Sequence, residues 1–338
     1  MKEIEVEKAI GTVLAHDVTQ ILPGEYKGPR FKKGHVIKEE DIPVLLSMGK
    51  QHLYVVEKED QDIHEDEAAL RIAKAACGSG VTLKGPSEGK VEIFADIDGL
   101  LKINVDLLGH LIEQDDIMFA SIKENQLVKK GDKLAGTRVI PLFVNPGVVE
   151  AAEKTLEEGT LIQVKPLKKM KVGLVTTGSE VYSGRIEDKF GPVLDKKFKD
   201  LGSEVFKQYF ADDDVKMISE KIKLLIEEGA EIIGVTGGMS VDPDDRTPSG
   251  IRAAGGHIVI YGAPVLPGAM FMLAYIDNVP VVGLPGCVMY SRTSIFDLIV
   301  PRLLAGEHVT RGDVKRLAHG GLCMDCEVCT YPKCGFGK

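Results

Sequence analysis

Three glycine-rich turns in the second half of the chain each follow a short run of β-branched and other apolar residues. The turns span residues 176–180, 236–240 and 284–286. A strand buried on both faces has this kind of sequence, and ligands of an open α/β sheet bind outside the carboxyl ends of its strands, where backbone N–H groups meet anions. The three turns therefore predict one phosphate-binding site shared by neighbouring strands.

The spacing of the predicted strands indicates consecutive βαβ units. The strands should begin near residues 172, 204 and 231, roughly thirty residues apart. Helices are expected between them at 188–201 and 215–228, and the second follows Asp212-Asp213-Asp214, which offers N-cap and first-turn carboxylates. Because crossovers of this kind are right-handed in nearly all cases, the sheet should be parallel and covered on both faces.

Three further elements complete this predicted domain. Residues 257–261 should form a strand, and 270–276 should pair with 279–284 around a turn. A single helix is expected from about 288 to 304, closed by Gly306.

The first half of the chain predicts smaller units, with a helix at 39–48, a strand at 52–56 and short alternating runs that recur between glycines after residue 77. The expected segments are an N-terminal α+β segment (1–60), a small β-rich, α+β or barrel-like unit (61–145), a connecting helix (146–167), an α/β domain (168–310) and a tail (311–338). The predicted fold class is therefore α/β: a three-layer parallel-sheet domain preceded by a smaller α+β or β-rich region, with a Cys-rich C-terminal tail.

Charge and hydropathy exclude two classes of protein. A net charge of −9 argues against a general nucleic-acid binder, which usually has a basic excess. No apolar run approaches the roughly 20 residues that span a bilayer, and the acidic start is unlike a secretory signal. We therefore expect a cytoplasmic protein without nucleic-acid or membrane partners.

Four of the six cysteines crowd the last sixteen residues as Cys-x2-Cys-x2-Cys-x4-Cys, at Cys323, Cys326, Cys329 and Cys334. In a cytosolic chain this crowding indicates a metal rather than disulfides. Four thiolates can bind Zn²⁺ tetrahedrally or hold an iron–sulfur cluster. The first three cysteines resemble the start of a bacterial ferredoxin run, but the x4 spacing and the position of Pro332 differ from it. Zinc and a cluster stay open as alternatives, with a flexible redox or metallochaperone tail as the third.

The order of the turns and their neighbouring residues resembles molybdopterin-binding domains of the MoaB/Mog type. Residues 176–180, 184–188, 212–213 and 236–241 carry the resemblance, which covers about residues 168–306. Gly283-Leu284-Pro285-Gly286 is similar to the loop of the MoeA-like molybdenum-insertion branch, and residues 31–56 are similar to a segment in the amino-terminal part of MoeA proteins.

This resemblance implies a three-layer α/β domain that binds molybdopterin and its phosphate at the strand ends. Related proteins activate molybdopterin with Mg-ATP or insert molybdate into the adenylylated form. Three departures limit the inference. Cys287-Val288 follows Gly286 where the family usually has Asn-Pro, Asp188-Lys189-Phe190 replaces Asp-Ser-Asn, and residues 241–248 look closer to the MoaB/Mog and CinA-like branches. Binding is therefore better supported than a particular catalytic step.

The candidate site residues lie in or beside the three turns. Candidates for cofactor binding are Thr177, Gly178, Ser179, Asp188, Gly237, Gly238, Ser240, Pro285, Gly286 and Arg292. Candidates for catalysis or for Mg²⁺ are Glu180, Asp244 and Asp245.

Most of these residues also have a structural alternative. Gly237-Gly238 can serve only as a tight turn, Glu180 as a surface ion pair, and Arg292 as a solvated side chain. Asp244 and Asp245 can cap a helix that starts near residue 249, and Asp212 and Asp213 are expected mainly as helix caps.

Two classes of function follow from the resemblance. One is an enzyme, a molybdopterin adenylyltransferase or molybdotransferase, which would use Mg²⁺ and ATP or the adenylylated pterin. The other is a non-catalytic carrier or sensor that delivers the cofactor to a molybdoenzyme. A CinA-like nucleotide hydrolase is a third hypothesis. Relatives commonly form dimers or trimers, so a homo-oligomer is expected.

Overall fold

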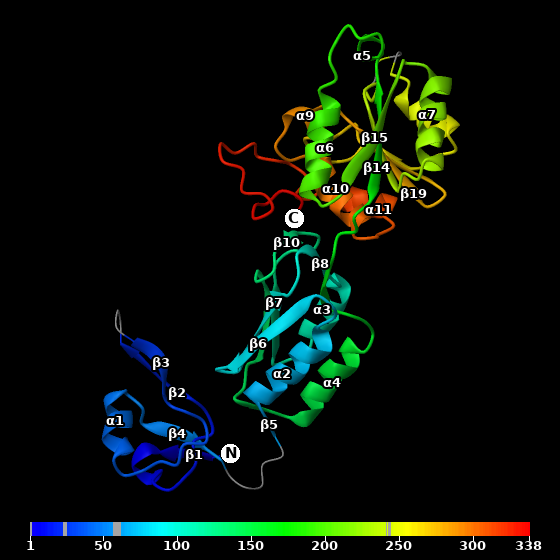
Figure 1. Ribbon diagram of the computed structural model, residues 1–338. Coiled ribbons are helices and arrows are strands. Elements are labelled where there is room, and N and C mark those ends of the chain that lie inside the picture. The colour runs from blue at the N-terminus through cyan, green and yellow to red at the C-terminus, as the bar shows by residue number, and fades with distance from the viewer. Residues whose placement is uncertain (1, 23–25, 57–61, 241, 243–244) are drawn as a thin grey trace. The chain divides into compact units, whose positions relative to one another are not determined.

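The computed structural model describes residues 2–22, 26–56, 62–240, 242 and 245–338. The chain divides into two compact units (Figure 1). The first comprises residues 1–96, 103–122 and 131–163, and the second comprises residues 97–102, 123–130 and 164–338.

The beginning of the first unit is a small α+β structure. Strands β1 (Lys2–Glu5) and β4 (His52–Val55) pair antiparallel, and β2 (Val18–Leu22) forms a hairpin with β3 (Tyr26–Phe31). The 3₁₀ helix η1 (Val6–Lys8) and helix α1 (Asp41–Ser47) complete it. Apolar side chains from these elements and from the segments that connect them form one buried core, which includes Leu14, Leu45 and Leu53. The expected helix and strand of this segment are present.

The rest of the first unit is α+β rather than a barrel, because an open four-stranded antiparallel sheet packs against α2. Its strands run in the order β6 (Val81–Ser87), β7 (Lys90–Ala95), β11 (Lys133–Val139) and β9 (Ile117–Ser121). Its helices are α2 (Glu65–Ala76), α3 (Val105–Ile112) and α4 (Pro146–Leu156). Strands β5 (Ile63–His64) and β12 (Phe143–Val144) form a small antiparallel pair. A separate three-stranded sheet, in the order β10 (Leu127–Val128), β8 (Gly99–Ile103) and β13 (Ile162–Lys165), lies mostly in residues of the second unit.

The second unit is built on a six-stranded sheet. The strand order is β15 (Glu204–Ala211), β14 (Lys171–Thr177), β16 (Ile232–Thr236), β19 (Val279–Leu284), β18 (Met272–Ile276) and β17 (His257–Tyr261). The first four strands are parallel, as expected from the βαβ spacing, whereas β18 and β17 extend the sheet antiparallel. The antiparallel extension arises because β18 and β19 form the expected hairpin, with Asp277 at a positive φ of 51° in its turn.

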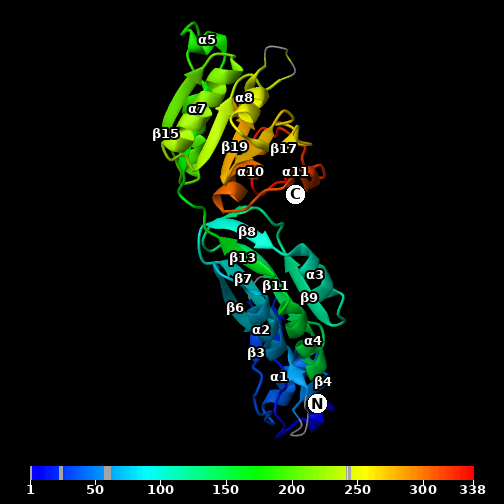
Figure 2. The same cartoon turned by 90° about the vertical axis from the view of Figure 1, so that its right-hand side faces the viewer.

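Helices cover both faces of this sheet and give the predicted three layers. Helices α6 (Phe190–Asp200) and α10 (Ile295–Leu304) pack on one face, and α7 (Val215–Glu227) and α8 (Thr247–Ala253) pack on the other (Figures 1 and 2). In β14, Val172 and Leu174 face the first layer and Val175 faces the second. The strand is apolar throughout because both of its faces are buried.

The single helix expected at 288–304 is wrong. The structure has a short α9 (Cys287–Tyr290), a break, and then α10. Ser294 accepts a hydrogen bond from the Phe296 N–H, while the Asp297 carboxylate accepts one from the Ser294 N–H at 2.8 Å. This capping box starts a new helix at Ile295 and interrupts the apolar periodicity.

The C-terminal segment is folded onto the α/β unit. After α11 (Arg311–Arg316), residues 317–338 contain no helix or strand, and all of them are described. The side chain of Phe336 is only 4% exposed, and the Tyr331 hydroxyl donates to the Asp297 carbonyl at 2.9 Å. The sequence does not predict this docking, because the anchoring residues lie between cysteines and glycines rather than in a periodic pattern.

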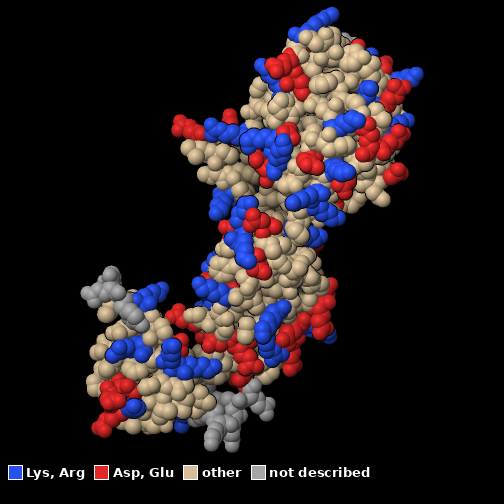
Figure 3. Space-filling model, in the orientation of Figure 1, with Lys and Arg blue, Asp and Glu red and all other residues tan. Residues whose placement is uncertain are grey.

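None of the helices in the described part of the chain is long and apolar enough to cross a membrane. On the face drawn in Figure 3, acidic and basic side chains are interspersed. Local contacts, rather than the overall charge of −9, therefore determine the electrostatics of any one site.

Candidate functional site

Four neighbouring parallel strands of the second unit end side by side. Ala211 of β15 pairs with Thr177 of β14, Thr176 pairs with Thr236 of β16, and Thr236 pairs with Leu284 of β19. The three glycine turns therefore leave the sheet at one edge. Helix α5 (Ser179–Tyr182) directly follows β14 at this edge (Figure 1).

A buried hydroxyl network joins the first turn to the second. The Thr177 and Thr247 hydroxyls lie 3.0 Å apart, and the Thr247 hydroxyl donates to the Gly237 carbonyl at 2.8 Å. Both threonine side chains are almost fully buried. Thr247 was missed by sequence reasoning, and its only local signal is its place before Pro248 at the start of a helix.

Gly237 and Gly238 are required by the shape of this turn. Both have positive φ, 84° and 51°. A Cβ on Gly237 would overlap the Thr177 carbonyl oxygen, and one on Gly238 would lie 3.0 Å from the Thr247 hydroxyl oxygen. The structural role alone accounts for both glycines, because a side chain would strain the backbone at either position and would clash with its neighbours.

Ser179 in the first turn is held by two carboxylates. Its hydroxyl donates to Asp212 Oδ1 at 2.5 Å, and its backbone N–H donates to Asp213 Oδ2 at 3.0 Å. The Ser179 hydroxyl and the Asp213 N–H lower the pKa of Asp212. The expectation that Asp212 and Asp213 cap the next helix is wrong, because Asp214 makes the N-cap bond to the Met217 N–H at 2.8 Å.

Asp188 lies in a second polar network. Its carboxylate accepts from the Phe190 N–H at 2.9 Å, and it also accepts from Gln208 Nε2. The same Gln208 nitrogen donates to the Thr176 hydroxyl at 2.9 Å, and the Thr236 hydroxyl lies 3.3 Å from that of Thr176. Asp188 therefore fixes the start of α6 and links it to the sheet.

The second turn continues into a loop that bears carboxylates. Ser240 is exposed, and the Tyr261 hydroxyl donates toward the Ser240 and Met239 carbonyls at 3.2 and 3.1 Å. Burial, and then the negative charge of Asp245, raise the pKa of Tyr261. Asp244 lies outside the described residues.

The third turn is open to solvent. Gly286 is exposed, its φ of −54° suits any residue, and a Cβ there would meet nothing within 4 Å. Pro285 is buried, and its carbonyl accepts from the Val288 N–H at 3.0 Å. Burial raises the pKa of the adjacent Cys287 thiol. The side chain of Glu180, at the first turn, is also exposed.

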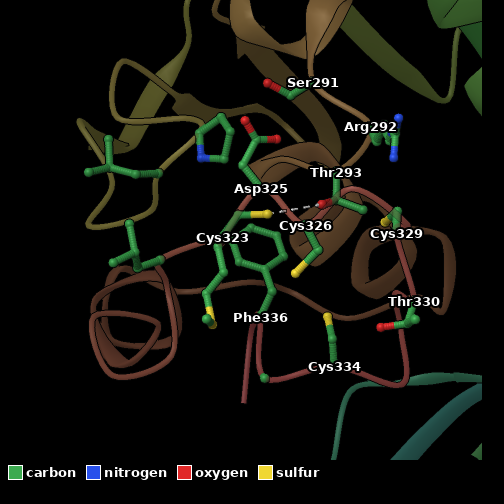
Figure 4. Close-up of a pocket in the computed structure, with 15 residues that line it drawn as sticks. Ser291, Arg292, Thr293, Cys323, Asp325, Cys326, Cys329, Thr330, Cys334 and Phe336 are labelled. Atoms are coloured by element: carbon green, nitrogen blue, oxygen red, sulfur yellow. Dashed lines mark hydrogen bonds between the residues drawn. The ribbon is translucent and has the colours of Figure 1, made fainter.

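Arg292 contacts the tail. It lies in the break between α9 and α10, and its Nη1 donates to the Glu327 carbonyl at 2.6 Å. Figure 4 shows it at the rim of a cavity with the tail cysteines. The broken helix therefore gives Arg292 a partner in the tail, and this hydrogen bond does not involve the glycine turns.

The four tail cysteines line this same cavity, whose volume is about 420 Å³. Cys323 and Cys334 are half-buried, whereas Cys326 and Cys329 are exposed. In the described part of the chain, no three His, Cys, Asp or Glu side chains are grouped closely enough to hold a metal ion. The sulfur atoms thus share a cavity without forming a ready coordination sphere.

Comparison with known domain families agrees with the resemblance. Residues 173–305 match the family described as "Probable molybdopterin binding domain", and residues 3–57 match a "Domain of unknown function (DUF8806)". The first match covers the sheet and all three turns. Residues 173–305 are thus a domain of the molybdopterin-binding type.

Individual relatives extend the similarity beyond that domain. A molybdopterin molybdenumtransferase of Staphylococcus aureus (strain COL) is 23% identical over 305 residues, which cover 84% of this chain and 66% of the relative. A CinA-like protein of Mycobacterium sp. (strain MCS) is 30% identical over 91 residues, covering 27% of this chain and 22% of that protein. The chain is therefore MoeA-like, with a MoaB/Mog-type domain, and it spans about two thirds of the length of the curated MoeA relatives.

Two solved structures are also similar. The MoeA protein of Pyrococcus horikosii is 16% identical, with a TM-score of 0.35, over 93% of this chain and 76% of its own. The MoaB protein of Pyrococcus furiosus, described as tungsten cofactor synthesizing, is 20% identical, with a TM-score of 0.32, over 43% of this chain and 98% of its own.

Proposed function

We propose that the α/β domain binds molybdopterin, or its adenylylated form, at the edge formed by the three glycine turns, and that the protein acts in molybdenum-cofactor biosynthesis. The observation that carries this proposal is the register of β14, β16 and β19, which ends the three strands side by side. The family match over residues 173–305 gives the class of ligand, and this edge is where open α/β sheets bind ligands.

The three turns would have different roles toward the ligand. Gly237 and Gly238 would keep the backbone close to the sheet and free of side chains. Ser240 and Gly286 are exposed, so a ligand could reach this edge of the sheet at these two residues. Ser179 already donates its hydroxyl and its N–H to carboxylates, so we assign it to positioning Asp212 and Asp213 rather than to phosphate.

Carboxylates at this edge would supply Mg²⁺ ligands if the ligand is Mg-ATP. Glu180, Asp212 and Asp213 flank the first turn, and Asp245 follows the second. Mg²⁺ is usually held by one or two carboxylates together with substrate phosphates. Phosphoryl and nucleotidyl transfer depend mainly on positioning and charge neutralisation, so these groups would suffice for such a step without a histidine base. Asp244 stays a candidate from the sequence alone.

The proposal has an enzymatic and a non-catalytic form. In the first the protein is an adenylyltransferase or molybdotransferase, and in the second it carries or senses molybdopterin for a recipient molybdoenzyme. The name of the Staphylococcus aureus relative favours the enzymatic form. Release of pyrophosphate from Mg-ATP, or consumption of adenylylated molybdopterin, would distinguish an enzyme from a carrier. A homo-oligomer remains part of both forms.

Titration of anaerobically purified protein with molybdopterin tests the site. Gly286→Trp should fill the edge without straining the fold, because the position has negative φ and open space for a side chain. We expect saturable binding by the natural chain and at least about tenfold weaker binding by the variant, a change of about 1.4 kcal/mol or more.

Gly109→Trp is the matched control, since a Cβ there also meets nothing within 4 Å and Gly109 lies in α3 of the other unit. This variant should bind molybdopterin as the natural chain does. Equal affinity in Gly286→Trp, or no binding by the natural chain, would contradict the proposed site.

A nucleotide hydrolase is the second candidate. It is favoured by the 30% identity with the CinA-like protein and by the acidic loop after the second turn, where the Asp245 N–H donates to the Asp242 carbonyl at 3.0 Å. Hydrolysis of nucleotide in the absence of any pterin would support this candidate over cofactor biosynthesis.

A further inference from the structure

We propose that Cys323, Cys326, Cys329 and Cys334 form a tetrahedral four-thiolate zinc site in the C-terminal segment. The proposal is independent of pterin binding. It starts from their common cavity, which all four cysteines line: Figure 4 shows the Cys323, Cys326 and Cys334 sulfur atoms toward its middle and Cys329 to one side. All four thiols are free.

Both ends of the cysteine segment are held on the α/β unit. The Cys323 N–H donates to the Leu266 carbonyl at 2.8 Å, and the Cys323 sulfur lies 3.7 Å from the Thr293 hydroxyl. At the other end Phe336 is buried, and the Gly337 N–H donates to the Gly320 carbonyl at 2.8 Å. The segment is therefore a loop whose two ends are already held in place. Metal binding then costs less conformational entropy than it would in a free chain.

The middle of the loop lacks regular structure of its own. Residues 323–334, all of them described, contain no helix or strand, and Cys326 and Cys329 are exposed. Exposed free thiols are generally avoided in folded proteins. The presence of two exposed cysteines in a loop with two further cysteines therefore calls for a functional explanation. A bound metal supplies one, because it replaces the thiol protons and holds together a loop that has no helix or strand of its own.

Binding of one ion by all four sulfur atoms requires the loop to close around it. No three potential ligands are grouped for a metal in the described residues, so Cys326 and Cys329 must move toward Cys323 and Cys334. The exposed positions of Cys326 and Cys329 leave them room to do so. Binding of one Zn²⁺ by four thiols forms four Zn–S bonds and releases up to four protons to solvent.

Ligand spacing favours zinc over an iron–sulfur cluster. Structural zinc sites pair cysteines at Cys-x2–4-Cys, and each successive pair here has that spacing. The ferredoxin-type run has three residues before its fourth cysteine and a proline after it, whereas four residues separate Cys329 from Cys334, and Pro332 precedes the last cysteine.

Metal analysis of the full chain, purified anaerobically without chelator, tests the proposal. We expect about one zinc per chain, and replacement of zinc by Co²⁺ should give the visible absorption of a tetrahedral thiolate site. The double variant Cys326→Ser, Cys329→Ser should lose at least nine tenths of the zinc. Cys77→Ala is the control and should keep it, because burial raises the pKa of the Cys77 thiol to about 11 and it lies outside the loop.

A second measurement separates loss of the site from loss of folding. Hydrogen exchange of residues 317–338 should slow on addition of zinc to the metal-free natural chain, with no change in the double variant. The substituted residues are exposed, so the buried contacts of Tyr331 and Phe336 should persist in the variant. Zinc-independent exchange, disulfide-linked cysteines without metal, or iron and sulfide in place of zinc would overturn the proposal.

Discussion

At the scale of single residues, uncharged hydroxyl groups connect the turns of the candidate site. Thr176, Thr177, Thr236 and Thr247 are all at most 3% exposed, and their hydroxyls link β14 to β16 and to the first residue of α8. Buried hydroxyl groups need hydrogen-bond partners. Here the Thr176 and Thr236 hydroxyls pair with each other, and the Thr177 and Thr247 hydroxyls do the same. The positions of the turns relative to one another therefore depend on a few neutral hydrogen bonds.

Replacement of Thr247 by Val should weaken both the fold and the site. The change keeps the shape of the side chain but leaves the Gly237 carbonyl without its 2.8 Å donor. We expect a loss of about 1–3 kcal/mol in the free energy of unfolding and weaker molybdopterin binding. Urea denaturation and pterin titration measure the two effects.

The control for this change is Thr82→Val, which alters an exposed threonine on β6 and should change stability by less than about 0.5 kcal/mol. If Thr247→Val and Thr82→Val behaved alike, the hydroxyl network would have no energetic role.

At the scale of elements, capping side chains determine where the last helices begin. Ser294 and Asp297 start α10, and Thr310 and Asp313 form a second capping box at α11. Asp313 also pairs with the buried Arg302, whose Nη2 lies 3.0 Å from Asp313 Oδ1. Although burial opposes the charge of Asp313, hydrogen bonds from Thr310 and the nearby Arg302 hold its pKa well below its ordinary value of 3.8.

The contribution of Asp313 to stability should therefore depend on pH. A carboxylate whose pKa is lower in the folded state stabilises the fold above its unfolded pKa, and the effect declines as the pH falls below about 4. Asp313→Asn should cost about 2 kcal/mol near pH 7, and the difference between the two proteins should shrink toward pH 3. Urea denaturation across this pH range measures it.

Asp200→Asn serves as the control, because the Asp200 pair with Lys196 is exposed and such pairs contribute little. A pH-independent difference between the natural chain and Asp313→Asn would show that the charge of Asp313 does not stabilise α11.

At the scale of the whole molecule, the C-terminal segment belongs to the core of the second unit. Phe336 and Tyr331 pack with α10 residues, and Phe336 is 4% exposed. Residues 164–338 therefore form one compact body with residues 97–102 and 123–130. The hypothesis of a flexible tail does not agree with this packing.

Phe336→Ala should destabilise the second unit by about 3–5 kcal/mol, because it removes a large side chain from a closed core. Tyr290→Ala removes an aromatic side chain that is 82% exposed, and it should cost less than about 0.5 kcal/mol. Thermal unfolding of the full chain measures both. A small effect at Phe336 would mean that the segment is only loosely attached in solution.

Local patterns in the sequence predicted most of the second unit. Apolar runs predicted the starts of β14, β15 and β16, and both ends of α7, to within about one residue. The hairpin of β18 and β19 was predicted for the same reason. The helix break was missed although the polar residues 291–294 separate the apolar runs on either side of it, because the capping box at Ser294 and Asp297 depends on two polar side chains that the apolar pattern does not register.

The sequence by itself determined the strand–helix alternation, the position of each glycine turn and the crowding of the cysteines, because these depend on neighbouring residues and on short-range backbone preferences. Only the tertiary structure decided which distant groups meet. Thr247 reaches Thr177, Asp212 reaches Ser179, and Arg292 reaches Glu327, in each case because strand register and helix packing bring together residues that are far apart in the chain. No local pattern encodes such contacts, since they depend on the closed geometry of the whole sheet and its helix layers.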